Sequence, residues 1–80
     1  MLFHITQTHS PDNCPKNEGG LSDLYDADAK GVKIIGIYGA FVQHKMFYIL
    51  EADDLKAIQG FLDPGWTRCD VSITPVGTEI

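Results

Sequence analysis

Hydrophobic and polar residues alternate along the first eight positions of the chain. One side of this alternation carries Met1, Phe3, Ile5 and Gln7, and the other side carries Leu2, His4, Thr6 and Thr8. A period of two is typical of a β-strand with one buried face. The same alternation returns from Arg68 to Thr74 and predicts a last strand, which Pro75 ends.

The middle of the chain holds two continuously apolar runs. The segment from Lys33 to Phe41 is rich in isoleucine, glycine and aromatic residues, and the segment from Met46 to Glu51 is apolar almost throughout. Short runs of this kind predict strands that are buried on both faces. Because only four residues separate them, we expect the two strands to form a hairpin.

Two further segments have the spacing of helices. Leu21, Leu24 and Tyr25 predict a short helix that ends at Lys30, before Gly31. Asp53 is a suitable N-cap for a second helix, whose apolar residues recur at helical intervals up to an Asp-Pro-Gly stop. These apolar residues are Leu55, Ile58, Phe61 and Leu62.

The order of these elements is βαββαβ. With right-handed crossovers, it predicts a ferredoxin-like α+β fold: a four-stranded antiparallel sheet with two helices on one face. The first strand is expected to lie between the third and the fourth. Eighty residues suffice for one domain, so residues 1–80 are predicted to form a single ferredoxin-like domain. A chain this short is marginally stable alone and often needs a partner.

The predicted sheet has one face without helices, and its two halves differ in polarity. The first and last strands give this face a polar half, while the hairpin strands give it an apolar half. The polar residues are His4, Thr6, Thr8, Asp70, Ser72 and Thr74. A contiguous apolar surface is seldom left exposed to water. We therefore expect a homodimer that packs sheet against sheet and encloses a small pocket of mixed polarity.

Composition and charge narrow the classes of function. The chain is 44% hydrophobic and 21% charged, with a net charge of −5, so it lacks the basic surface of a nucleic-acid-binding protein or of one attracted to anionic membranes. The N-terminal segment lacks the charged and apolar regions of a signal peptide. Cys14 and Cys69 do not form a disulfide framework, and we expect reduced thiols in a cytoplasmic protein.

Three short motifs resemble the dimeric α+β-barrel superfamily of small ferredoxin-like proteins. The opening Met1–Ile5 is similar to that of muconolactone isomerases, and the segments 51–54 and 70–76 resemble small uncharacterised members. The resemblance implies a homodimer with a pocket over the open sheet face. The superfamily includes isomerases, cofactor-free monooxygenases, haem-degrading enzymes and proteins without known activity, so the fold does not define the function.

The first functional hypothesis is a small-molecule-binding protein or a cofactor-free enzyme of isomerase or oxygenase type. His4 is the candidate general base or hydrogen-bond donor, and Asp70 is the candidate carboxylate that orients it. The predicted ligand-binding residues are His4, Thr6, Tyr48, Ser72 and Trp66.

The alternative hypothesis is a transition-metal-binding protein. His9, Cys14 and His44, together with His4 in one variant, offer imidazole and thiolate groups suited to zinc, nickel or copper. Strand alternation places His4 and His9 on opposite faces of the sheet. The spacing matches no standard zinc motif. A third hypothesis, an interaction module without a ligand, stays open.

Overall fold

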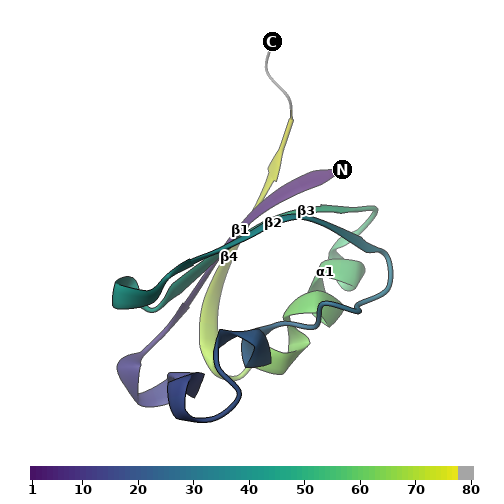
Figure 1. The fold of residues 1–80 in the computed structure, drawn as a ribbon. Helices are drawn as coiled ribbons and strands as arrows, with labels where there is room; N and C mark the ends of the chain where they lie inside the picture. Colours follow the sequence, from purple (N-terminus) through teal and green to yellow (C-terminus); the bar gives the residue numbers. More distant parts are fainter. Residues whose placement is uncertain (78–80) are drawn as a thin grey trace.

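A four-stranded antiparallel sheet forms the centre of the computed structural model, which describes residues 1–77 (Figure 1). Residues 78–80 of the predicted domain lie outside the described residues. The strands are β1 (Leu2–His9), β2 (Val32–Ala40), β3 (Lys45–Ala52) and β4 (Cys69–Val76). Their order in the sheet is β2-β3-β1-β4. The predicted position of β1, between β3 and β4, is therefore confirmed.

One α-helix, α1 (Leu55–Leu62), packs against the sheet. Its N-cap is Asp54 rather than the predicted Asp53, because the Asp54 carboxylate accepts a hydrogen bond from the Ala57 N–H at 2.9 Å. Ile58, Phe61 and Leu62 are buried as their spacing predicts, whereas Leu55, in the first turn, is 61% exposed.

The helix predicted from Leu21 to Lys30 does not form. Only Leu21–Leu24 is helical, as a single 3₁₀ turn. After it, the Asp26 N–H donates to the Phe61 carbonyl at 2.8 Å, and the Asp26 carboxylate accepts from the Asp28 N–H at 2.9 Å. An aspartate that bonds nearby backbone in this way competes with a helix, so the chain turns toward β2 instead.

The core lies between the sheet and α1. It contains ten buried apolar residues, which come from β1, β3, α1 and the Leu21–Leu24 turn: Phe3, Ile5, Leu24, Met46, Tyr48, Leu50, Ala52, Ile58, Phe61 and Leu62. Tyr25, Tyr48 and Phe61 form an aromatic cluster with ring centroids 5.2–5.6 Å apart. Aromatic pairs at this spacing stabilise a fold by more than the burial of their apolar area alone.

A polar pair lies within this core. The Tyr48 hydroxyl donates to Gln7 Oε1 at 2.6 Å, and Gln7 Nε2 donates to the Leu24 carbonyl at 3.0 Å. Burial raises the pKa of Tyr48 well above its usual value, so its hydroxyl stays protonated. The prediction that Tyr48 lines a pocket on the open face is therefore wrong, because its side chain points into the core.

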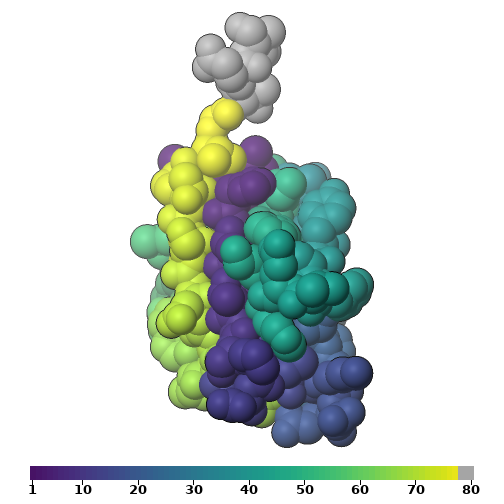
Figure 2. All heavy atoms as spheres, turned by 90° about the vertical axis from the view of Figure 1, so that its left-hand side faces the viewer, coloured from purple at the N-terminus to yellow at the C-terminus, as the bar shows by residue number. Residues whose placement is uncertain are grey.

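In the part of the chain that the structure describes, no helix crosses the strands on the opposite side of the sheet, and Figure 2 shows the four strands side by side on it. The register places His4 between Ile49 and Thr74, and Thr6 between Phe47 and Ser72. The polar half of this open face is thus arranged as the sequence predicts. The other half is apolar at Phe47 and Ile49 but charged at Lys33, Lys45 and Glu51.

Strand β2 lies at the edge of the sheet rather than being buried on both faces as predicted. Ile35 is 52% exposed and Tyr38 is 60% exposed. Strand β4 occupies the other edge and continues through Pro75 to Val76, since an edge strand tolerates a residue without an N–H group. Within residues 1–77, no helix has both the length and the apolar character needed to cross a bilayer.

Candidate metal centre

Two histidines meet where β1 ends and β3 begins. The His9 N–H donates to the His44 carbonyl at 3.1 Å, which ties the end of β1 to the β2–β3 connection. The two rings are nearly perpendicular, and His9 Nε2 lies 3.3 Å from His44 Nδ1. The sheet thus brings together two imidazoles that are 35 residues apart in the sequence.

His44 has a left-handed backbone conformation, with φ of 54° and ψ of 44°. Among residues 1–77 it is the single non-glycine residue with a positive φ. The preceding 3₁₀ turn, Phe41–Gln43, ends when the His44 N–H donates to the Phe41 carbonyl at 3.3 Å. Backbone strain of this kind is concentrated at functional sites.

Cys14 lies between two 3₁₀ turns, Pro11–Asn13 and Pro15–Asn17. Both turns begin with a proline, whose ring fixes φ. The Cys14 N–H donates to the Pro11 carbonyl at 3.3 Å, and Pro15 is buried. The backbone is therefore restrained on both sides of the thiol.

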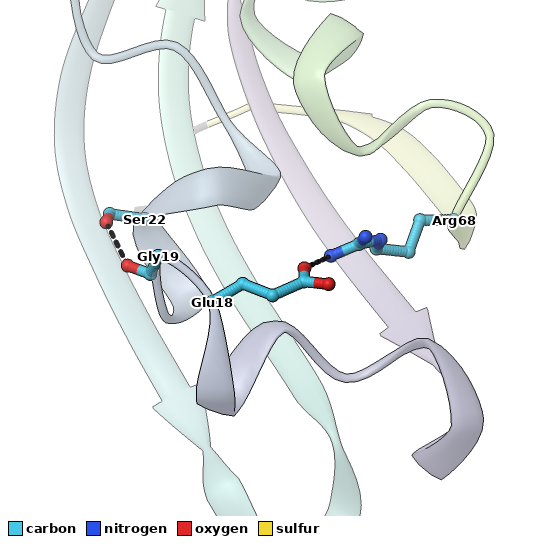
Figure 3. A network of polar contacts seen from close by, with 4 residues as sticks. All are labelled: Glu18, Gly19, Ser22 and Arg68. Carbon is cyan, nitrogen blue, oxygen red and sulfur yellow. Dashed lines mark hydrogen bonds and ion pairs between the residues drawn. The ribbon is translucent and has the colours of Figure 1, made fainter.

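An ion pair attaches the loop that carries Cys14 to the segment before β4. Arg68 Nη1 lies 2.9 Å from Glu18 Oε2, and the Ser22 hydroxyl donates to the Gly19 carbonyl at 3.2 Å (Figure 3). Both partners of the ion pair are partly exposed to solvent, so it contributes at most about 1 kcal/mol. It therefore links the loop to this segment without adding much to the stability of the fold.

The three potential ligands form one cluster. One ligand atom from each of His9, Cys14 and His44 lies within 4.8 Å of the other two. From zinc–ligand distances and tetrahedral angles, two nitrogens on one zinc ion lie about 3.3 Å apart, and a nitrogen and a sulfur about 3.6 Å apart. The His9–His44 spacing already matches, and a movement of about 1 Å by the thiol would complete the set.

His9 is almost completely buried, at 3% exposure. Its Nδ1 is the single buried side-chain nitrogen or oxygen among residues 1–77 without a hydrogen-bond partner. Burial, and then the nearby His44 and Arg68 charges, lower the pKa of His9 below its usual value, which favours the neutral imidazole that metals bind. An unsatisfied buried group costs about 1–3 kcal/mol, so His9 is not placed here for stability alone.

A cavity of about 500 Å³ opens beside the cluster. Its lining combines the three potential ligands with four residues of small or apolar type and two lysines: His9, Cys14, Lys16, Gly20, Leu21, Phe41, Val42, His44 and Lys45. Imidazole and thiolate groups at the wall of a cavity are suited to hold a metal ion that a small molecule can reach.

The sequence matches one protein family. Residues 1–79 match the profile described as "Domain of unknown function (DUF3303)". The chain belongs to the DUF3303 family. No curated protein and no solved structure matches it. For this DUF3303 chain, the function must therefore be argued from the site itself.

The open-face site predicted for this DUF3303 protein is brought together only in part. His4 is exposed and lies beside Thr74 in the register, whereas Asp70 lies opposite Thr8. Asp70 and Thr74 are four positions apart along the strand, or about 13 Å. Asp70 therefore does not lie beside His4 and cannot orient it as predicted.

The other predicted ligand-binding residues fall in different places. Thr6 and Ser72 are neighbours on the open face. Trp66 is 49% exposed, in the connection between α1 and β4. Cys14 and Cys69 are free thiols, and burial raises the pKa of Cys69.

The two lysines of the cavity were missed by the sequence analysis. Their closeness in the sequence to the potential ligands could have indicated them, since Lys16 follows Cys14 by two residues and Lys45 follows His44 directly. Gln7 was also missed, because its place on the apolar side of β1 gives no sign that it bonds Tyr48.

Proposed function

We propose that this protein binds one transition-metal ion through His9, Cys14 and His44. The observation that carries the proposal is the convergence of two imidazoles and one thiol from three separate segments within 4.8 Å. The 3.3 Å spacing between His9 Nε2 and His44 Nδ1 supports it, because two nitrogens that bind one zinc ion lie about that far apart.

Zinc is the ion that we expect first. It binds thiolate and imidazole together, and sites with three protein ligands keep a fourth position open. Copper and nickel also bind imidazole, and copper has a known preference for two histidines with one cysteine. Metal analysis of the protein as purified, without added metal, distinguishes these outcomes, because copper binds most nitrogen and sulfur sites more tightly than zinc or nickel when all three are supplied.

Protein purified without a histidine tag should bind one ion per chain when dialysed against zinc. Cys14→Ser should weaken zinc binding at least tenfold, because a hydroxyl is a poorer ligand than a thiolate. Cys69→Ser is a stringent control, since Cys69 lies opposite His9 in the pairing of β1 with β4 but outside the cluster. Elemental analysis gives the stoichiometry, and competition with a chromogenic chelator gives the dissociation constant.

The two cysteine variants separate specific binding from adventitious binding. Equal loss of zinc in both variants, or no loss in Cys14→Ser, contradicts the proposed site. A stoichiometry well below one ion per chain in the unmodified protein contradicts it as well. Unfolding curves of both variants without metal establish that any difference comes from the ligand and not from misfolding.

We propose further that two copies pair through the open sheet face in a ferredoxin-like dimer. The strand order β2-β3-β1-β4, with α1 on the opposite side, supports this arrangement, as do the exposed side chains of Ile35 and Tyr38. A predicted small-molecule pocket over the polar half, with His4 in its lining, belongs to the same proposal.

The apolar residues of β3 suit a second copy as the occupant of this face. Phe47 and Ile49 share the open face near the middle of the strand. A two-fold axis across the strands brings Phe47 of each copy toward Ile49 of the other. This self-complementary arrangement is what a symmetric dimer requires.

Tyr38→Glu should shift the protein toward monomers, because it places a charge in the apolar half of the interface. Leu55→Glu is the control, since Leu55 is equally exposed but lies in α1, on the other side of the sheet. Sedimentation equilibrium at micromolar concentration measures both. A monomeric unmodified protein, or equal dissociation of both variants, contradicts the dimer.

A further inference from the structure

The cavity beside the metal cluster has an unusual charge for this protein. The chain carries a net charge of −5, yet the nine residues that line the cavity include two lysines and no acidic residue. Among residues 1–77, the one ion pair joins Arg68 to Glu18, so neither Lys16 nor Lys45 is neutralised by an ion pair. The cavity is therefore a cationic site on an acidic protein.

The other walls of the cavity are apolar. Leu21 comes from a 3₁₀ turn, while Phe41 and Val42 come from the β2–β3 connection and are largely exposed. Gly20 adds no side chain. A volume of about 500 Å³ lies within the range of small-molecule pockets. The walls thus suit the hydrocarbon part of a small ligand.

The metal proposed above would add to this charge. A divalent ion bound by one thiolate and two neutral imidazoles leaves the centre with one net positive charge, to which the lysines add two. Three protein ligands also leave the fourth zinc position free. Since the cavity adjoins the cluster, a ligand in it can reach that position.

We infer that the cavity binds a small carboxylate with an apolar body, whose carboxylate occupies the fourth metal position. This inference rests on the proposed metal function. Lys16 and Lys45 attract and hold the carboxylate, and Leu21, Phe41 and Val42 contact the hydrocarbon part. A neutral molecule of the same shape lacks both the metal–oxygen bond and the attraction of the lysines.

Cobalt-substituted protein tests the inference, because the visible absorption of cobalt(II) depends on its coordination. Titration with hexanoate should change the cobalt spectrum to saturation, whereas hexanol at the same concentration should not. Lys16→Gln combined with Lys45→Gln should weaken hexanoate binding at least tenfold without weakening cobalt binding, since the lost positive charges repel the cation. Lys56→Gln, on α1 and outside this cavity, is the matched control and should behave like the unmodified protein.

The outcomes distinguish a failure of the metal site from a failure of the carboxylate site. If cobalt and zinc do not bind, the metal proposal fails and the carboxylate inference fails with it. If cobalt binds tightly but hexanoate leaves its spectrum unchanged, the inference alone is overturned. Equal responses to hexanoate and hexanol, or unchanged hexanoate affinity in the lysine variant, also overturn it.

Discussion

Gly65→Ala should lower the free energy of unfolding by about 3 kcal/mol or more, since it both overpacks the core and disturbs a buried hydrogen bond. A β-carbon at Gly65 would lie 2.7 Å from the Leu24 carbonyl oxygen and 2.9 Å from Gln7 Nε2. Those two atoms form the hydrogen bond that anchors Gln7. The backbone must move or the bond must break, and urea unfolding followed by far-ultraviolet circular dichroism measures the cost.

Gly60→Ala is the matched control for this experiment. Gly60 lies within α1, and a β-carbon built there would meet no atom within 4 Å apart from its chain neighbours and the backbone of its own helix. Alanine in a helix interior is favoured over glycine by about 1 kcal/mol. The two substitutions should therefore move stability in opposite directions. A Gly65→Ala variant as stable as the unmodified protein would contradict this prediction. It would show that neither the Gln7–Leu24 hydrogen bond nor the close packing at Gly65 contributes much to stability.

The first and last strands were predictable because each has the alternation that one buried face imposes. β1 shows this best, since Phe3 and Ile5 alternate with His4 and Thr6 and the structure buries the first pair. The same alternation placed His4 and His9 on opposite sides, and the structure confirms it with His4 exposed and His9 buried. Periodicity of this kind depends on local geometry, which the sequence contains.

The errors came where tertiary contacts outweigh the local pattern. The Leu21–Lys30 segment has helical spacing, but two hydrogen bonds of Asp26 are incompatible with a continuous helix. Its N–H donates to the Phe61 carbonyl, and its carboxylate accepts from the Asp28 N–H. Tyr48 was assigned to the open face although its parity with Met46 and Leu50 places it in the core. A strand that is apolar on both sides gives no sign in the sequence of which side faces the helix.

The metal cluster could be suggested from the sequence but not located. His9 and Cys14 are close in the chain, and the turns on either side of Cys14 follow from two prolines. His44 joins them only because β1 and β3 are neighbours with a register that aligns Thr8 with Lys45. That register is a property of the whole sheet, so no short motif records it.

Zinc should stabilise the unmodified protein by about 2.7 kcal/mol when its concentration is one hundred times the dissociation constant. His44→Gly should remove almost all of this effect. Loss of a ligand should weaken zinc binding more than about 100-fold, since losing a residue that only hydrogen-bonds to a ligand already weakens metal binding about 10–100-fold. The same zinc concentration then stabilises the variant by about 0.4 kcal/mol or less. Urea unfolding with zinc and with a chelator measures both states.

Without metal, His44→Gly should be nearly as stable as the unmodified protein. Glycine adopts the φ of 54° without the cost of about 1 kcal/mol or more that a side chain incurs there, and this offsets the lost contact with His9. His44→Asn is the second variant, because asparagine tolerates the same backbone but has no imidazole. If the asparagine variant kept the zinc effect, His44 would not be a ligand. If both variants unfolded without metal, His44 would be structural, and the strained backbone at the end of the hairpin would need a different explanation.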